Sequence, residues 1–559
     1  MRERRRLDSR EQANRHTCKI LLNCYLRECG SEHSSGITLK PAEKTYEIRF
    51  PASGVVLSGK LSGYSVMGEH EYDSFHTHEG NEPTCTELAE WIVAELRLHR
   101  GAATDEQAAD FADKVANSVR NTALFLEHSE PVRVEDYLSS EQSLRFGHPF
   151  HPYPKNTLGF MEEEVRRFSP ELRAAFPLCY MAVRKDAYRE EWIAERREVE
   201  LPESVEAHAG DALGNRRDAY ELLPVHPWQY AHVQGCDAVR DYVRQGKIVP
   251  LGSCGPLAYP TSSVRTVYVP AMRCNIKLSL DIQITNLKRN NTKEQMRRTL
   301  DAARYLRRSR GFAQEPHTRI AFEEGVCCCA FEEEQATAWL TVAYRPIRFD
   351  TAATYVLSSL VEPPARGEPV RLLSVMEPNH VEAWFRRYLD ISLRPIVRIA
   401  EEQGIHFEAH LQNALLTVKD GMPDTFIIRD LEGVSVEREK AGEQEDTSGP
   451  LFYEREQARA RTAYYYFVNH LGSLIHAIAR DMSSDETYLW GIVREALAEE
   501  YELGGNEFAG ELLAADVFYA KKNMMSCLAG NSETPDYVPV INRMKSMGRE
   551  WKGAHKQLV

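Results

Sequence analysis

The stretch that decides the fold is TSSVRTVYVPAMRCNIKLSLDIQITNLKR, which runs from Thr261 to Arg289. Over residues 276–285 it alternates strictly between apolar and polar side chains. Alternation with a period of two predicts a β-strand that turns one apolar face toward the core. The segment 263–269 is rich in β-branched residues and is followed by a proline, so we predict a second strand beside the first.

The polar face of this predicted strand pair carries several cations and hydroxyl groups. Its members are Ser263, Arg265, Lys277 and Thr285, with Arg289 just beyond the strand end. Fixed cations beside hydroxyls satisfy the oxygens of phosphates and carboxylates. The plain alternative is an ordinary solvated strand face, and the motifs described below favour anion binding over it.

The composition is that of a globular protein with several subdomains. A chain of 559 residues is too long for one core, so we expect two to four subdomains. The net charge of −14 argues against nucleic-acid binding by bulk charge. No apolar run is long enough for a membrane span, and the basic N-terminus lacks the apolar segment of a secretory signal. The twelve cysteines have no zinc-binding spacing, which predicts reduced thiols in a cytoplasmic protein.

Periodicity and capping residues predict the elements around the central stretch. Thr84 and Glu87 form a capping-box pattern that opens one helix, and Ser483 with Glu486 opens another. The remaining expectations are strands over 44–75, 221–226 and 338–347, helices over 17–29, 161–200, 293–310, 381–403, 453–481 and 486–503, and a polar linker over 203–216.

A second distinctive segment is EQSLRFGHPFHPYPKNTLGF, residues 141–160. His148 and His151 are each followed by proline, so the segment is not a regular helix. A constrained loop that carries these histidines and Lys155 suits ligand contacts, although a rigid surface turn explains it equally well. Metal binding by the two histidines lacks a third ligand nearby. His226, beside Trp228, is interpreted as a packing residue.

A third segment, residues 405–433, reads as a β-hairpin: a strand over 414–418, a Lys-Asp-Gly turn and a returning strand over 426–429. The hairpin brings Asn413 and Asp430 side by side. Their oxygens suit a Mg²⁺ ion that bridges nucleotide phosphates, an arrangement similar to the metal-binding Asn and Asp of protein kinases. Glu408 and His410, just upstream, would orient substrate or assist the metal. The alternative is a plain hairpin with solvated polar ends.

Together these motifs resemble those of a known family. They are GHPxHPxxK at 147–155, HPWQ at 226–229, SxRT at 263–266, Lys277, TNxxR at 285–289, EAHxQN at 408–413 and RDxEG at 429–433. As a set they resemble the IucA/IucC family of siderophore synthetases, which act independently of nonribosomal peptide synthetases. The resemblance implies an α+β cupped-hand fold with antiparallel sheets, usually a homodimer. Its parts would be a thumb-like region over 1–140, a fingers-like region over 141–370 and a palm-like region over 371–559.

The resemblance also implies a reaction and residue roles. A carboxylate, commonly citrate, is adenylated with ATP and then captured by an amine, a polyamine or a hydroxyl. The implied ATP ligands are Ser263, Arg265, Thr266, Lys277, Arg289 and His410. The implied carboxylate contacts are His148, His151, Lys155, Thr285, Arg289 and His410, and the implied Mg²⁺ site is Asn413 and Asp430 with Glu408. Of these, Arg289, Lys277 and His410 are the expected catalytic residues, and His410 or Glu408 would help to deprotonate the amine.

The chemistry agrees with this assignment, because the substrate carboxylate is itself the nucleophile and no Ser/His/Asp or Cys/His pattern is needed. Two departures from the family pattern, Asn156-Thr157 and the AYRPI segment around Arg345, bear on the identity of the acyl substrate. Alternatives are the same chemistry on 2-oxoglutarate or a citryl monoamide, a kinase-like phosphotransferase, and a nucleotide-binding regulatory protein. The complete set of charged site residues argues against the last.

Overall fold

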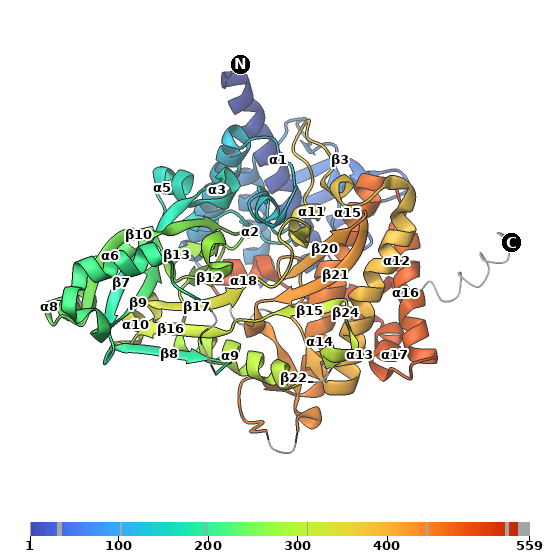
Figure 1. The fold of residues 1–559 in the computed structure, drawn as a ribbon. Coiled ribbons are helices and arrows are strands. Elements are labelled where there is room, and N and C mark those ends of the chain that lie inside the picture. The colour runs from blue at the N-terminus through green and yellow to red at the C-terminus, as the bar shows by residue number, and fades with distance from the viewer. Residues whose placement is uncertain are drawn as a thin grey trace.

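An eight-stranded antiparallel sheet forms the frame of the molecule (Figure 1). The computed structural model describes residues 2–30, 36–100, 103–195, 197, 199–309, 311–442, 445–531 and 536–545. In sheet order the strands are β8 (Tyr188–Trp192), β16 (Gly325–Cys329), β17 (Thr341–Pro346), β12 (Cys274–Lys277), β11 (Thr266–Val269), β10 (Ile248–Pro260), β7 (Phe176–Arg184) and β9 (Tyr220–Val225).

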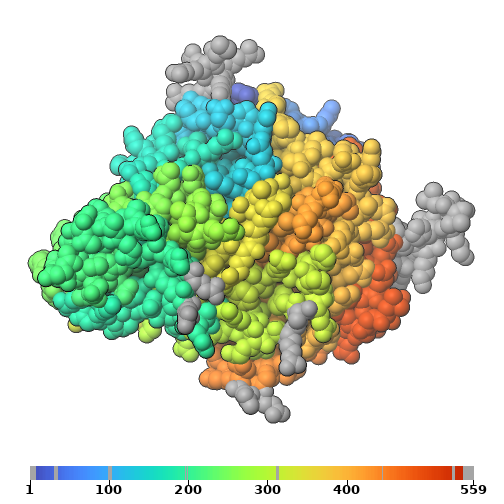
Figure 2. Space-filling model, viewed as in Figure 1, coloured from blue at the N-terminus to red at the C-terminus, as the bar shows by residue number. Residues whose placement is uncertain are grey.

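Helices α6 (Glu203–Leu213), α7 (Pro227–Gln234) and α8 (Asp237–Arg244) pack against this sheet and share its core. Figures 1 and 2 show this part as a lobe at the left of the molecule. Two predictions in the lobe were wrong. The expected helix over 161–200 is only α5 (Glu162–Phe168), followed by β7 and β8, because the largely buried run 176–183 forms a strand that pairs with β10 on one side and β9 on the other. The expected linker over 203–216 contains α6, whose buried residues Val205, Ala209 and Leu213 recur every four positions.

The alternating stretch 276–285 forms two strands in different sheets instead of one. Ile276 belongs to β12 of the large sheet, whereas Ile282 belongs to β13 (Leu280–Ile284), which pairs with β6 (Thr157–Leu158) and β14 (Leu287–Arg289). The break lies at Ser279, whose hydroxyl is 2.6 Å from the Ala338 carbonyl oxygen. The polar side of the alternation therefore bonds to helix α10 (Glu334–Trp339) at this point, and the apolar side continues into a second small core.

The N-terminal part combines a small sheet with three helices. Its strands are β1 (Ile37–Lys40), β2 (Thr45–Phe50), β3 (Val55–Gly63), β4 (Glu71–Tyr72) and β5 (His76–Thr77). Its helices are α1 (Arg2–Cys29), α2 (Cys85–Arg100) and α3 (Asp105–His128). The predicted capping box is confirmed, since Thr84 and Glu87 exchange hydrogen bonds at the start of α2. The C-terminal helix α18 (Asn523–Ala529) also packs into this core.

The C-terminal part carries the predicted hairpin, which is confirmed as β20 (Ala414–Lys419) and β21 (Met422–Arg429). The hairpin is flanked by β15 (Thr318–Ala321) and β18 (Thr354–Val356). Seven helical segments surround it: α12 (Val381–Ile391), α13 (Leu393–Gln403), α14 (Arg455–Thr462), a π-helical segment (Ala463–Leu471), α15 (Gly472–Met482), α16 (Glu486–Glu502) and α17 (Glu507–Ala514).

Two predictions about these helices were wrong. Residues 381–403 form two helices instead of one, because Pro395 has no N–H to donate to the Ile391 carbonyl, which instead accepts a hydrogen bond from Thr318. Helix α16 is capped by Asp485 instead of Ser483, through hydrogen bonds from the Thr487 and Tyr488 amides at 2.6 and 3.2 Å.

Two general features concern the protein's surroundings. None of the described helices has the length and hydropathy needed to cross a bilayer. All twelve cysteines lie in the described ranges, and none of them forms a disulfide.

We expect Ile282→Ala to lower the free energy of unfolding by about 2–5 kcal/mol, because Ile282 is fully buried in the small core. Leu98→Ala is the matched control, since the Leu98 side chain is exposed and its loss should change stability by less than about 0.5 kcal/mol. Chemical denaturation of both variants measures the difference. Equal stability losses would contradict the assignment of 282 to a core strand.

His226 lies in the core, as the packing interpretation predicted. It is fully buried, its Nδ1 accepts a hydrogen bond from the Trp228 amide at 3.2 Å, and the rings of Phe168 and Phe176 lie against it. Burial lowers the pKa of His226 from 6.5 to about 3. Between these values the unfolded chain binds a proton that the folded chain does not, so stability falls as the pH falls.

Replacing His226 with Gln should therefore make the pH dependence of unfolding shallower, by up to about 1.4 kcal/mol per pH unit between about pH 6 and pH 3. Urea unfolding across this range measures the slope. His380→Gln serves as the control because His380 is exposed. A slope that is unchanged in His226→Gln would show that another group causes the pH dependence.

Candidate active site

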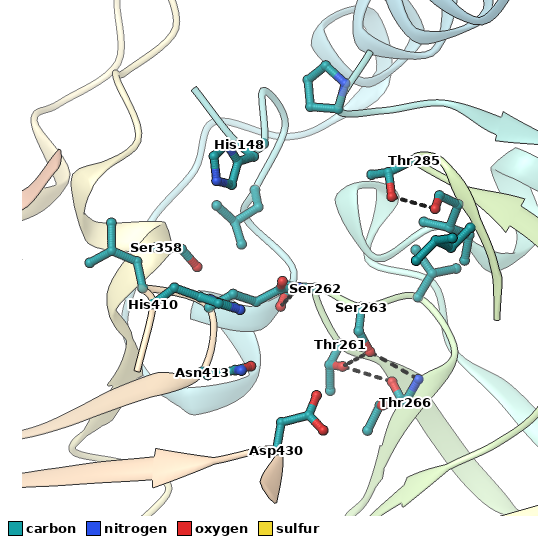
Figure 3. A pocket seen from close by; sticks show the side chains of 18 of the residues that line it. His148, Thr261, Ser262, Ser263, Thr266, Thr285, Ser358, His410, Asn413 and Asp430 are labelled. Atoms are coloured by element: carbon teal, nitrogen blue, oxygen red, sulfur yellow. Dashed lines mark hydrogen bonds between the residues drawn. The ribbon is translucent and has the colours of Figure 1, made fainter. Parts of the chain in front are cut away.

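A cavity of about 940 Å³ lies where the large sheet, the hairpin and the His148 loop meet. It is lined by most of the predicted site residues: His148, Lys155, Ser263, Arg265, Thr266, Lys277, Thr285, Arg289, Glu408, His410, Asn413 and Asp430. In Figure 3, His410, Asn413 and Asp430 on the hairpin side face Ser263 and Thr266 on the sheet side. The fold thus brings together residues from three separate segments of the chain.

The sheet side of the cavity is a tight loop between β10 and β11. The Thr261 amide donates to the Thr266 carbonyl at 2.8 Å, and the Ser263 hydroxyl accepts from the Thr266 amide at 3.2 Å. Val264 at the tip has a φ of +65°, which is a strained conformation for a β-branched residue. Thr285 and Asp430, which also line the cavity, are left-handed as well. Such strain is typical of functional sites.

Arg265 and Arg289 are cations without an anionic partner. Arg265 donates to the carbonyls of Arg289 and Asn290 and to the Asn291 side chain, and Arg289 donates to Ile284 and Thr285. In the described part of the chain no carboxylate lies within ion-pair distance of either guanidinium, and the buried Arg289 Nε has no acceptor. Burial, followed by the nearby Arg265, lowers the pKa of Arg289 to about 10, so it stays charged. These two cations are available to an anionic ligand.

Lys277, in contrast, is paired. Its Nζ lies 3.0 Å from Asp430 Oδ1 and 3.5 Å from Glu432 Oε2. Arg345, on the neighbouring strand β17 and on the same face, lies 4.0 Å from Asp430 and forms a buried pair with Glu323. Burial by itself would raise the pKa of Asp430, but Lys277 and Arg345 outweigh it and hold this pKa well below its usual range. Asp430 is therefore an anion at neutral pH.

The upstream side of the hairpin is packed closely. A methyl group at Gly433 would lie 2.0 Å from Glu408 Oε2, so only glycine fits where this carboxylate passes. Asn413 donates its Nδ2 to the Glu408 carbonyl at 3.2 Å. Burial lowers the pKa of His410, although Glu408 and Asp430 oppose the shift. His410 is consequently neutral at neutral pH and able to accept a proton.

The predicted magnesium site offers few protein ligands. No group of three or more His, Cys, Asp or Glu side chains among the described residues is arranged for a metal. Mg²⁺, however, commonly uses one or two protein oxygens together with waters and substrate phosphates. Asn413 Oδ1 and Asp430 Oδ2 are without hydrogen-bond donors in the described ranges, and both residues line the cavity. The two residues fit a Mg²⁺ that a nucleotide helps to hold.

A buried ion pair joins the two sides of the cavity. The Arg429 guanidinium at the end of β21 pairs with Glu141, which ends α4 (Tyr137–Glu141). Glu141 also accepts hydrogen bonds from the amide and the hydroxyl of Ser262, at 3.1 and 2.9 Å. Arg429 donates to the Gln412 carbonyl at 2.8 Å. The strained loop and the hairpin are thereby attached to one carboxylate.

The residues of the predicted 141–160 loop have different environments. His148 lines the cavity, and Gly147 before it is left-handed. Lys155 lines it too, but its Nζ is held 2.7 Å from Glu171. His151 does not line the cavity, and its Nε2 lies 3.7 Å from the Cys527 sulfur. Lys155 and His151 therefore have protein partners of their own.

Sequence reasoning missed part of the cavity lining. Tyr465 and Asn469 come from the π-helical segment, a conformation that often marks functional sites, and Lys521 comes from β24 (Val517–Lys521). Lys521 Nζ lies 2.7 Å from the Tyr465 hydroxyl, and burial lowers its pKa. The N-terminal region also reaches the cavity, through Glu69 and Lys19. None of these residues stands in a local motif that would have revealed it.

Comparison with known proteins identifies the family. Residues 136–352 match the IucA / IucC family model, and residues 382–536 match that of the ferric iron reductase FhuF-like transporters. The L-2,3-diaminopropanoate–citrate ligase of Staphylococcus aureus is 32% identical in an alignment 518 positions long that covers 87% of this chain and 89% of that protein. The chain belongs to the IucA/IucC family of siderophore synthetases. The resemblance indicated by the motifs is thereby confirmed.

Two further members extend the comparison. The spermidine-citrate ligase of Bacillus anthracis is 26% identical to this synthetase in an alignment 579 positions long that covers 93% of this chain and 94% of that protein. The structure of ATP-bound aerobactin synthetase IucA from Klebsiella pneumoniae superposes with a TM-score of 0.83 at 22% identity, and covers 95% of this synthetase and 99% of that chain. The predicted α+β fold with antiparallel sheets is thus the fold of a solved IucA/IucC structure.

We expect Arg429→Ala to lower the free energy of unfolding of the synthetase by about 3–5 kcal/mol, because it leaves the Glu141 carboxylate buried without its partner. Arg15→Ala, which breaks the exposed pair with Glu82, should cost less than about 1 kcal/mol. Denaturant unfolding distinguishes the two. Similar losses would mean that the buried pair does not hold the cavity walls together.

Proposed function

We propose that this synthetase uses ATP and Mg²⁺ to activate a carboxylate of citrate as its acyl-adenylate and then condenses it with an amine. In the first step a carboxylate oxygen attacks the α-phosphorus and pyrophosphate leaves. In the second, the amine nitrogen bonds to the acyl carbon, the bond to AMP breaks and the nitrogen loses a proton. The observation that carries the proposal is the pair of unpartnered cations, Arg265 and Arg289, in a cavity that also holds an ionised Asp430.

The charge arrangement suits an attack between two anions. Arg265 and Arg289 would offset most of the repulsion between the carboxylate and the triphosphate, while Lys277, which is paired with Asp430, would contribute less. Ser263 and Thr266 would donate hydrogen bonds to phosphate oxygens, while Thr285 and His148 would contact the carboxylate substrate. Asn413 and Asp430, with Glu408 close by, would hold the Mg²⁺, which supplies charge neutralisation at the phosphates.

Neutral His410 is the proposed proton acceptor for the incoming amine. His151 and Lys155 would support the carboxylate site from behind, through their loop. Citrate and an amine with more than one amino group are proposed as substrates because the names of two relatives, the diaminopropanoate–citrate and the spermidine-citrate ligases, specify them. A cytoplasmic homodimer with thumb-like, fingers-like and palm-like regions over 1–140, 141–370 and 371–559 completes the proposal.

The decisive experiment measures the products of ATP with purified protein, Mg²⁺, a panel of carboxylates and hydroxylamine as a general nucleophile. Pyrophosphate and AMP released only with citrate would support the proposal. Release with 2-oxoglutarate instead would change the acyl substrate. Release of ADP would overturn adenylation in favour of phosphotransfer.

Arg289→Ala should abolish citrate-dependent pyrophosphate release, a fall of at least about 100-fold, while the fold persists. The guanidinium contacts backbone and Thr285 only, so its removal unpairs no buried carboxylate. Lys288→Ala is the control, since the exposed Lys288 bonds only to Asp281. Near-normal turnover by a well-folded Arg289→Ala protein would refute the assignment of this cation.

A further inference from the structure

Among the described residues, the cavity contains one buried carboxylate that neither the proposed reaction nor any ion pair uses. Glu69 lies in the loop between β3 and β4, is 7% exposed and lines the same cavity as His148 and Arg289. Its Oε2 accepts a hydrogen bond from the Ser473 hydroxyl on α15 at 2.8 Å. No lysine, arginine or histidine of the described residues lies within ion-pair distance of it.

The carboxylates around Glu69 are all paired. Glu71 lies 2.7 Å from Lys19 and 3.1 Å from His476, and Glu486 lies 2.8 Å from His476. Asp481 likewise pairs with Arg480 at 2.6 Å. The nearby cations therefore have closer partners than Glu69.

The remaining cation near this loop is also engaged. The Arg27 guanidinium stacks 3.0 Å from the centre of the Phe150 ring and lies beyond ion-pair distance of Glu69. His16 also lines the cavity. It carries no charge at neutral pH, because burial and then Lys19 lower its pKa to about 3. Its buried Nε2 has no hydrogen-bond partner in the described ranges. A buried carboxylate and an orphaned imidazole nitrogen thus face the cavity together.

The loop that carries Glu69 is held in place by residues from the C-terminal part of the chain. The Val66 amide in the same loop donates to Glu486 at 2.9 Å, and Met67 packs into the C-terminal core. A carboxylate that is held in place, nine-tenths buried and outside any ion pair has lost hydration that its one hydrogen bond, from Ser473, replaces only in part. A protonated amine would restore both charge and hydrogen bonds.

We propose that Glu69, oriented by Ser473, binds the protonated amine at the non-reacting end of the nucleophile. This inference rests on the proposed condensation with an amine. The cavity would then bind its substrates according to their charge. Arg265 and Arg289 bind the anions, and Glu69 binds the second amino group of a diamine, a polyamine or a diamino acid. The reacting amine must be neutral to attack, so only the distant amine carries the charge that Glu69 recognises.

The test compares nucleophiles that differ by one charged group: putrescine with butylamine, and lysine with norleucine. The wild-type enzyme should have the lower KM for the diamino member of at least one pair. Glu69→Gln should raise that KM by about 10- to 100-fold, with kcat and the KM of the monoamine changed less than about twofold. Glu69→Asp, which keeps the charge, should retain part of the preference.

Glu71→Gln is the matched control, because Glu71 is paired and does not line the cavity; it should lower stability without changing the preference. If Glu69→Gln fails to fold, Ser473→Ala should raise the KM of the diamine alone. Equal effects on diamine and monoamine, or no wild-type preference in either pair, would overturn the proposal.

Failure of the proposed function has a separate signature. It would appear as no carboxylate-dependent pyrophosphate release with hydroxylamine, which needs no second amine. Calorimetric titration of putrescine would then still report on Glu69: binding that Glu69→Gln weakens supports the cation site, and equal binding by both proteins refutes it.

Discussion

The site depends on one buried ion pair, that of Glu141 with Arg429. The pair joins the end of a short helix, the loop before β11 and the end of the β20–β21 hairpin, which lie far apart in the chain. Tyr137 extends the connection, since its hydroxyl accepts from Asn275 at 2.8 Å and from Arg429 at 3.3 Å. Burial by itself would raise the pKa of Glu141, but Arg429 and Ser262 hold it below its usual value. The two cavity walls therefore share one fixed charge.

The other cations of the cavity are of two kinds, which differ in their partners. Lys277 and Arg345 are neutralised by Asp430 and Glu323 and serve to keep Asp430 ionised. Arg265 and Arg289 are held by carbonyl oxygens, which fix a guanidinium without cancelling its charge. A site that must bring two anions together needs the second kind, because charges already paired within the protein attract a ligand weakly.

Local patterns predicted the parts of the site that lie in continuous segments. The hairpin with Asn413 and Asp430 follows from its turn residues, and the strand position of Lys277 follows from the alternation. Arg265, expected on the polar face of a strand over 263–269, lies instead in the loop before β11. The division of 276–285 between two sheets was not predictable, because the period of two continues across Ser279 while its partners, Ala338 and Thr341, are distant in sequence. Glu69 was missed for the same reason, since its partner Ser473 is 404 positions away. The apolar periodicity of 381–403 continues across the break before Pro395, so periodicity alone predicts one helix where the missing N–H of the proline leaves two.

The left-handed backbone at Val264 and Thr285 has a consequence for the balance between the stability of the enzyme and the rigidity of its cavity. Each β-branched residue in that conformation holds about 1–3 kcal/mol of unfavourable free energy. Glycine at either position would release it and make the protein more stable. The same change would free the loop that presents Ser263 and the turn that presents Arg289. At these two positions greater stability and a fixed cavity shape therefore exclude each other. The protein keeps a less stable backbone there and with it a rigid cavity wall.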